Sequence, residues 1–253
     1  MLFTFASICL ALAPISQATK EPTNAAEAAR KAAENAEIDR KYREVIAKLT
    51  PAEQAWEKTL QDHLGSFYLP LHKRDKIAGR SNAWDFVQDD PKLPRVLLIG
   101  DSVSRGYTQA ARKALAGKAN VHRAPANCGP TASGIKNIDA WLGEGKWDLI
   151  HFNFGIHDRA TPVADYTARL EQLVARMKKT GAKLVWASTT PIMSRTGDRF
   201  DDIRLRNEAA AEIMRARHVE IDDLYNFVLP HAKEWQGGDQ VHFNAAGNEN
   251  LGG

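Results

Sequence analysis

Short apolar runs alternate with longer amphipathic segments through the second part of this 253-residue chain. The first run, Val96-Leu97-Leu98-Ile99, is continuous, as expected of a strand that is buried on both faces of a sheet. Four more strands are predicted after it, at 120–123, 147–154, 183–187 and 219–222, with helices between them at 109–116, 135–142, 163–179 and 201–217. This alternation predicts a parallel sheet covered by helices on both faces.

The part of the chain before this sheet has a different pattern. Apolar residues from Ile38 to Leu49 form one stripe of a helix in a stretch rich in Ala, Glu, Lys and Arg. A capping box at 50–53, with proline at the first helical position, predicts a second helix, which we expect to end at Gly65. From 66 to 94 aromatic residues mix with turn residues. We therefore expect residues 19–94 to form a helical and irregular extension, packed on a main domain that begins at residue 95.

Residues 1–18 carry no charge and contain an apolar run from Leu2 to Leu12. The run is followed by the small-x-small pattern Ser16-Gln17-Ala18, so we predict a secretory signal peptide and a secreted or periplasmic protein. No later segment has the roughly 20 apolar residues that a membrane span needs. Because Cys9 lies in the predicted signal peptide, Cys128 would be alone in the mature chain, and no intramolecular disulfide is expected.

Charge gives little sign of a charged partner. The chain has 34 basic and 31 acidic residues, mixed along its length, and a formal net charge of +3. A nucleic-acid-binding protein usually has a concentrated basic stripe, and none stands out here, so we expect no nucleic-acid partner. The oligomeric state is left open.

Polar and small residues follow three of the predicted strands. Gly100-Asp101-Ser102 follows the first strand, Asn127 to Thr131 follow the second and Gly155 to Asp158 follow the third, while Asp239 to His242 come after the last predicted element. The carboxyl ends of parallel strands meet at one edge of the sheet, where active sites of such sheets lie. We therefore expect these four groups to converge.

The residue types in these groups suit acyl transfer to a serine. A serine hydroxyl is a weak nucleophile, and His242 can accept the proton of Ser102 while Asp239 orients the imidazole ring. The oxyanion also needs donors, for which the Ser102 and Gly129 backbone N–H groups and a side chain near 157 are candidates. Each motif alone is common in loops. Their joint occurrence, in this order and at strand ends, indicates a catalytic site.

Taken together, the groups resemble the SGNH (GDSL-like) hydrolase superfamily. Gly100-Asp101-Ser102 is similar to its first block, Gly129-Pro130-Thr131 to its second, and Asp239 to His242 to its last. The third block of the family is Gly-x-Asn-Asp, and Gly155-Ile156-His157-Asp158 differs at one fixed position. The resemblance covers roughly residues 95–247.

This resemblance implies a flavodoxin-like three-layer α/β/α fold and ester hydrolysis by a Ser102/His242/Asp239 triad, with no metal or organic cofactor. In the family the third-block asparagine donates its side-chain amide to the oxyanion. Here His157 stands in that place, and a neutral imidazole has one N–H that can donate. Asn127, beside the second block, is a second candidate for the oxyanion hole.

The last residues also differ from the family pattern, which usually continues into a closing helix. The sequence ends eleven residues after His242. We therefore expect Asn244 to Gly247 to be the first turn of a truncated C-terminal helix in a hydrolase domain spanning 95–253.

The function implied is that of an exported serine esterase. We expect it to remove acyl groups, acetyl in particular, from a small-molecule or polysaccharide ester such as acetylated carbohydrate. A lipase, a thioesterase or an acyltransferase would use the same triad. A non-catalytic carbohydrate- or protein-binding domain is the other interpretation, favoured by the altered third block and opposed by the intact triad.

Two further sites are disfavoured. A metal site would have to use the polar set His151, His157, Asp158 and His242, whose spacing matches no familiar ligand pattern. Cys128 has no paired histidine motif, so we interpret it as a small buried thiol beside the site rather than as a nucleophile.

Overall fold

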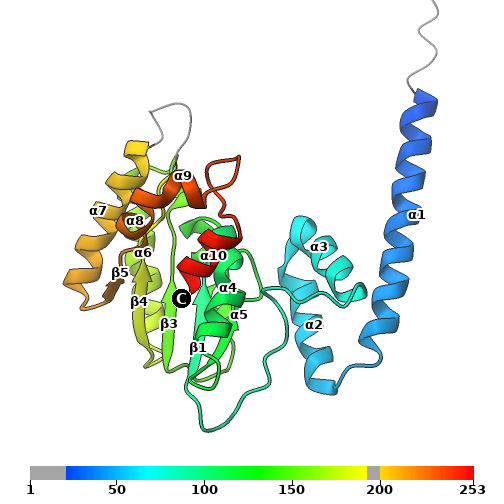
Figure 1. The fold of residues 1–253 in the computed structure, drawn as a ribbon, viewed down its shortest axis with the longest axis horizontal. Helices are drawn as coiled ribbons and strands as arrows, with labels where there is room; N and C mark the ends of the chain where they lie inside the picture. Colours follow the sequence, from blue (N-terminus) through cyan, green and yellow to red (C-terminus); the bar gives the residue numbers. More distant parts are fainter. Residues whose placement is uncertain (1–20, 193–199) are drawn as a thin grey trace, which may run out of the picture.

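The computed structural model describes residues 21–192 and 200–253, so the predicted signal peptide at 1–18 lies outside the described residues. The described chain forms a long helix, a pair of shorter helices and an α/β domain, in that order (Figure 1). Within these ranges no helix is both long and apolar enough to cross a membrane.

The α/β domain is built on five parallel strands. They are β1 (Arg95–Ile99), β2 (Asn120–Arg123), β3 (Leu149–Phe152), β4 (Lys183–Ala187) and β5 (Glu220–Asp222). Their order across the sheet is β2-β1-β3-β4-β5, and every neighbouring pair is parallel. This is the flavodoxin-like strand order, so the predicted fold class is confirmed. The strand order also places β1, which leads into Ser102, between β2 and β3.

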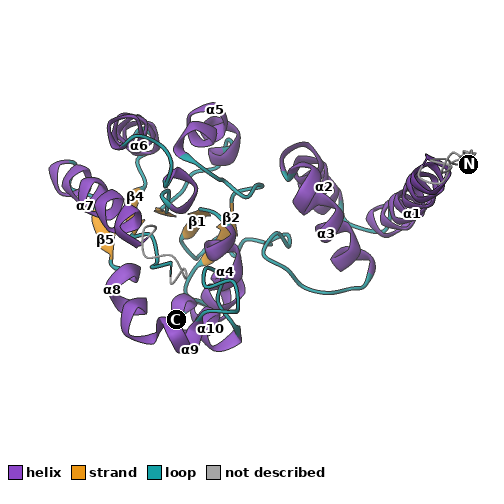
Figure 2. Ribbon diagram, turned by 90° about the horizontal axis from the view of Figure 1, so that it is seen from above, coloured by secondary structure: helices purple, strands orange, loops and turns teal. Residues whose placement is uncertain are grey.

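Helices cover both faces of this sheet (Figure 2). On one face lie α5 (Thr131–Leu142) and α6 (Val163–Lys178), and on the other lie α4 (Ser102–Ala114) and α10 (Ala245–Gly252). After β4 the chain also forms α7 (Phe200–Ala216), α8 (Leu224–Val228), η3 (Leu229–His231) and α9 (Ala232–Trp235). Helices α7 and α8 lie toward the β5 edge, and α9 lies beside α10 (Figure 2). The main core fills the space between the sheet and α5, α6 and α7, with Phe152 and Leu173 fully buried in it.

Two helices begin earlier than the sequence pattern predicts. Helix α4 was expected from 109 but begins at Ser102, and α5 was expected from 135 but begins at Thr131. The first turns of α4 contain serines and Gly106, which show no apolar periodicity. The side chain of Asp101 nevertheless accepts a hydrogen bond from the Val103 N–H at 2.9 Å, and this cap starts the helix.

The N-terminal extension consists of α1 (Glu21–Ile46), α2 (Pro51–His63) and α3 (Gly65–Ile77). Helix α2 begins at the predicted capping box, in which the Thr50 N–H donates to the Glu53 carboxylate at 2.8 Å. Only Leu64 separates α2 from α3, which begins at Gly65 with a φ of +70°. The sequence pattern of 66–94 indicated no particular helix, whereas α3 runs as far as Ile77, because the chain turns at Gly65 and continues at once as a helix.

The extension packs on the α/β domain through the segment that follows α3. Trp84 is 3% exposed, and its carbonyl accepts a hydrogen bond from the Trp56 indole at 2.7 Å. From α4, Arg112 donates to the backbone carbonyls of Asn82 and Asp85. These contacts attach the helical extension to the helix that carries Ser102.

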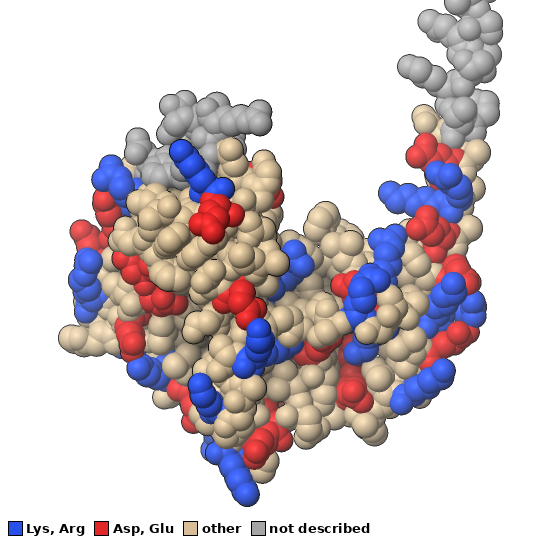
Figure 3. Space-filling model, viewed as in Figure 1, with Lys and Arg blue, Asp and Glu red and all other residues tan. Residues whose placement is uncertain are grey.

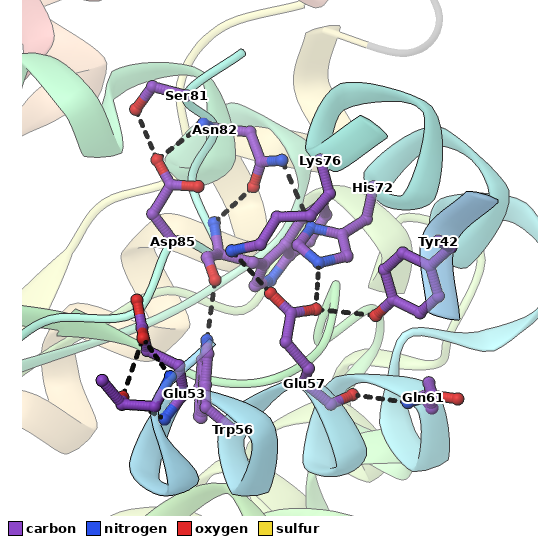
Figure 4. A network of polar contacts seen from close by, with 12 residues as sticks. Tyr42, Glu53, Trp56, Glu57, Gln61, His72, Lys76, Ser81, Asn82 and Asp85 are labelled. Carbon is purple, nitrogen blue, oxygen red and sulfur yellow. Dashed lines mark hydrogen bonds and ion pairs between the residues drawn. The ribbon is translucent and has the colours of Figure 1, made fainter. Parts of the chain in front are cut away.

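A buried carboxylate holds the three helices of the extension together (Figure 4). Glu57, on α2, has no exposed surface and accepts hydrogen bonds from the Tyr42 hydroxyl at 2.7 Å and from His72 Nε2 at 2.8 Å. Its other oxygen pairs with Lys76 Nζ at 2.8 Å. Burial by itself raises the pKa of Glu57, but the bonds from His72, Lys76 and Tyr42 outweigh it and bring the pKa to about 2. The carboxylate is therefore ionised at neutral pH.

We predict that Glu57→Ala lowers the free energy of unfolding of the extension by about 3–5 kcal/mol, because the substitution leaves buried donors unpaired. Urea unfolding followed by circular dichroism measures the change. Glu44→Ala is the control: Glu44 pairs with Arg40 on the exposed surface of α1, so the loss should stay below about 1 kcal/mol.

The same network makes stability depend on pH. Because folding lowers the pKa of Glu57 below its ordinary 4.5, the stabilisation is complete above about pH 4.5 and is lost as the pH falls toward 2. An acid transition that is unchanged in Glu57→Ala would contradict this assignment.

Candidate active site

Ser102 lies at the carboxyl end of the central part of the sheet. Strand β1 ends at Ile99, and the chain turns through Gly100 and Asp101 into the first residue of α4, which is Ser102. A Cβ at Gly100 would lie 2.6 Å from Ser104 Oγ, so only glycine fits this close approach. The turn therefore presents the Ser102 hydroxyl at the start of a helix, where the helix dipole favours negative charge.

His242 and Asp239 meet Ser102 from the other end of the chain. The Ser102 Oγ lies 2.7 Å from His242 Nε2, and His242 Nδ1 lies 2.6 Å from an oxygen of Asp239. The other oxygen of Asp239 accepts the backbone N–H groups of Val241 and His242 at 3.0 and 2.9 Å. The structure thus brings the three predicted triad residues into one hydrogen-bonded chain.

The charge state of Asp239 sets the direction of these bonds. The hydrogen bond from the His242 ring, helped by the backbone N–H groups, lowers the pKa of Asp239 to about 2. An ionised carboxylate only accepts hydrogen bonds, so Nδ1 of His242 must carry the proton. In a neutral ring the lone pair is then on Nε2, which faces Ser102 and can accept its proton.

The loop that carries Asp239 and His242 is closed on itself and held by α10. The Gly237 N–H donates to the His242 carbonyl at 2.7 Å, and the Asn244 N–H donates to the Trp235 carbonyl at 2.8 Å. The Asn244 side chain caps α10, which forms where a first helical turn was predicted. Helix α10 packs so closely against α4 that a Cβ at Gly252 would lie 2.5 Å from the Ala110 side chain. The two halves of the triad are therefore fixed by two touching helices.

The polar groups at 127–131 and 155–158 are hydrogen-bonded to each other beside this triad. The Cys128 N–H donates to the Gly100 carbonyl at 3.1 Å, which places the loop that contains Gly129 next to the Ser102 turn. The buried carboxylate of Asp158 accepts bonds from the Thr131 N–H at 2.8 Å and from its hydroxyl at 2.7 Å. Gly129 has φ +67°, a conformation that favours glycine.

The three predicted oxyanion residues lie in these tied loops. His157 is exposed, on a 3₁₀ turn (η1, Ile156–Asp158), and its ring forms no hydrogen bond within the described residues. Asn127 is half-buried, and its side-chain oxygen is buried without a partner in the same part of the structure. Within the described residues neither the Asn127 amide nitrogen nor the His157 ring donates a hydrogen bond. The oxyanion roles of His157, Asn127 and Gly129 stay predictions.

Arg123, which the sequence analysis did not single out, lies beneath the nucleophile turn. It is 2% exposed, and its guanidinium donates to the carbonyls of Gly100 at 2.9 Å and Asp101 at 2.8 Å and to Ser104 Oγ at 2.7 Å. Burial lowers the pKa of Arg123. Its place at the end of the second predicted strand, shortly before the polar group that starts at Asn127, was the available signal.

Three of the residues considered above for a metal site bond to different partners. His151 Nε2 lies 2.9 Å from the Asp222 carboxylate, while Asp158 bonds Thr131 and His242 bonds Ser102. Cys128 is 1% exposed, as expected of a small buried thiol, and burial raises its pKa to about 12. Because the thiolate is the reactive form, burial and the raised pKa disfavour a nucleophilic role for this cysteine.

Comparison with solved structures finds the same fold in hydrolases. A lipase/acylhydrolase from Enterococcus faecalis matches with 22% identity and a TM-score of 0.56, over 63% of this chain and 92% of that chain. An acetyl xylan esterase matches with 14% identity and a TM-score of 0.57, over 62% and 96% of the two chains. An acetylxylan esterase from Geobacillus stearothermophilus matches with 15% identity and a TM-score of 0.54, over 63% and 90%.

Sequence comparison places the same part of the chain in a family. A search among curated proteins found no match. The model of the GDSL-like lipase/acylhydrolase family, however, matches residues 98–249. This range is more than half of the 253 residues and contains all six predicted site residues. The chain therefore belongs to the GDSL-like lipase/acylhydrolase family.

Proposed function

We propose that this protein is an exported serine ester hydrolase that works through an acyl-enzyme on Ser102. The observation that carries the proposal is the continuous hydrogen-bonded chain from Ser102 Oγ through His242 to the ionised Asp239. Family membership supports the same reaction class. The uncharged apolar start of the sequence, 1–18, supports export.

In the proposed first step, Ser102 Oγ attacks the ester carbonyl carbon while His242 Nε2 takes the hydroxyl proton. Asp239 stabilises the imidazolium that forms. The tetrahedral intermediate collapses when the carbonyl re-forms, and the alcohol leaves with the proton from His242. The Ser102 and Gly129 N–H groups and a side chain, His157 or Asn127, would stabilise the oxyanion.

In the second step, water attacks the acyl-enzyme and gives its proton to His242. Collapse of the second intermediate releases the carboxylic acid and returns the proton to Ser102 Oγ. An acyltransferase would run the same sequence with an alcohol in place of water, so that an ester product would form in place of free acid.

We further propose that the acyl group is acetyl and that the alcohol is a carbohydrate. Two of the structural neighbours are acetyl xylan esterases, although their identity to this chain is only 14–15%. The side chains of His242 and Asp239 are 47% and 53% exposed. An open site of this kind suits acetyl groups carried on a large polymer better than a deeply enclosed acyl chain.

Ser102→Ala tests the proposed nucleophile. We expect kcat for p-nitrophenyl acetate to fall by a factor on the order of 10⁴–10⁶, because the covalent route is removed while the fold is kept. Matching urea unfolding curves for the two proteins serve as the control. Equal rates in wild type and variant would favour a non-catalytic binding domain that retains the hydrolase fold.

A second set of variants tests the oxyanion hole. We expect His157→Ala to lower kcat by about 10²–10³, the effect of removing one donor, and His157→Asn to restore most of it, since an amide can donate from the same place. Asn127→Ala is the matched comparison. A loss below about threefold in His157→Ala, with a larger loss in Asn127→Ala, would move the role to Asn127.

A further inference from the structure

The N-terminal extension places aromatic side chains beside the candidate active site. Figure 1 shows the first turn of α3 and the carboxyl ends of the strands on the same side of the molecule. The contact that joins them is made by Arg105, one turn after Ser102 on α4. Its guanidinium carbon lies 5.5 Å from the centre of the Tyr68 ring, on α3.

Helix geometry directs Arg105 toward the site. Residues three apart on a helix share a face, so Arg105 lies on the same face of α4 as Ser102. Side chains on a helix also tilt toward its N-terminus, which is the end that carries Ser102. The Nε of Arg105 is buried, and the side chain forms no hydrogen bond or ion pair within the described residues. The side-chain N–H groups of Arg105 therefore donate to none of the described residues.

Phe67 extends this surface into solvent. It is 70% exposed, more than any other large apolar side chain in the part of the chain that the structure describes. Its ring packs edge-on against Tyr68, with centroids 4.8 Å apart, and Tyr68 in turn packs against the buried Trp84 at 5.4 Å. The exposed ring is therefore held in place by a row of aromatic contacts.

Figure 3 shows mostly uncharged atoms at the upper end of α3, whereas charged side chains of both signs are spread along α1. A flat exposed ring beside a guanidinium suits a sugar, whose C–H face packs on an aromatic ring and whose hydroxyls accept N–H bonds. A long acyl chain would gain nothing from the guanidinium.

We propose that Phe67, Tyr68 and Arg105 form an aromatic rim that binds a sugar ring on the alcohol side of the ester. This inference rests on the proposed function and names the part of the substrate that the N-terminal extension recognises. The extension then acts as one wall of the substrate site.

The test compares two substrates in each protein: p-nitrophenyl acetate, whose alcohol part is small, and acetylated xylo-oligosaccharides. We expect Phe67→Ala to lower the ratio of kcat/KM for the oligosaccharides to kcat/KM for p-nitrophenyl acetate by roughly three- to tenfold, the value of one aromatic contact. Leu205→Ala is the control, because Leu205 is 47% exposed on α7, at the other end of the molecule (Figure 2). Its ratio should equal that of wild type.

A ratio in Phe67→Ala that stays within about twofold of wild type would overturn the rim. A preference for p-nitrophenyl palmitate that Phe67→Ala abolishes would also overturn it, because the rim would then bind acyl chains. If wild type hydrolyses none of these esters, the proposed function fails. Calorimetry then tests separately whether the aromatic rim binds the same oligosaccharides. In that measurement Phe67→Ala must weaken binding, and undetectable binding to wild type overturns the rim.

A different observation carries a second inference, which concerns the buried guanidinium of Arg123. Its three bonds end on Gly100, Asp101 and Ser104, the residues on either side of Ser102. The Arg123 side chain is covered by Trp84, whose ring lies 5.8 Å from the guanidinium carbon. We infer that Arg123 is a positioning residue, which sets the angle at which Ser102 meets His242.

Arg112 offers a matched control for this role. Like Arg123, it makes three hydrogen bonds through its guanidinium. Arg112 lies on α4, and its acceptors are the backbone carbonyls of Val121, Asn82 and Asp85, none of which belongs to the nucleophile turn. We expect Arg123→Met to lower kcat for p-nitrophenyl acetate about ten- to hundredfold with little change in KM, since misplacement of a nucleophile acts on the chemical step. Arg112→Met should lower the urea midpoint by a similar amount and leave kcat unchanged.

Arg123→Lys keeps the charge and one donor nitrogen, so its kcat should lie between those of wild type and Arg123→Met. If Arg123→Met does not fold, the kcat of Arg123→Lys is compared with wild type instead. An unchanged kcat in a folded Arg123 variant, or an equal loss of kcat in Arg112→Met, would overturn the positioning role.

Discussion

The buried guanidinium of Arg123, which bonds to no carboxylate among the described residues, organises the centre of this molecule. Removing a guanidinium from water is costly unless its donors are satisfied. The two terminal nitrogens of Arg123 bond to backbone carbonyls and a hydroxyl, and only its Nε has no partner among the described residues. Those acceptors belong to the turn between β1 and α4, so the turn cannot change shape without leaving the charge unsatisfied. The same side chain requires a cover, which the extension supplies in Trp84. The conformation of the nucleophile turn and the docking of the extension thus both follow from the burial of the Arg123 guanidinium.

The sheet was predictable from the sequence because its signal is local. Each strand is a short apolar run, and the polar groups that follow the runs meet at one edge through the parallel topology alone. Ser102, His242 and Asp239 were found in this way, although 140 residues separate the serine from the histidine. Their spatial order followed from the fold class, and their chemistry followed from the residue types.

What the sequence did not reveal depends on contacts between distant segments. Helix α3 was missed because Gly65, Ser66 and Pro70 are residues that usually mark turns, and its stability comes from His72 and Lys76 bonding Glu57 on α2. Arg123 was missed because a charged residue at a strand end is usually solvated. Its burial depends on a tryptophan 39 positions earlier, which no local pattern connects to it.

The packing of α10 on α4 has a consequence for when the site comes into being. Everything that makes Ser102 a nucleophile arrives with the loop before α10, and that loop is held in place by the docking of the helix. During synthesis the serine emerges long before its base, so the half-made chain carries only an ordinary alcohol. The reactive group therefore exists only once the segment that carries His242 has been made and α10 has docked on α4.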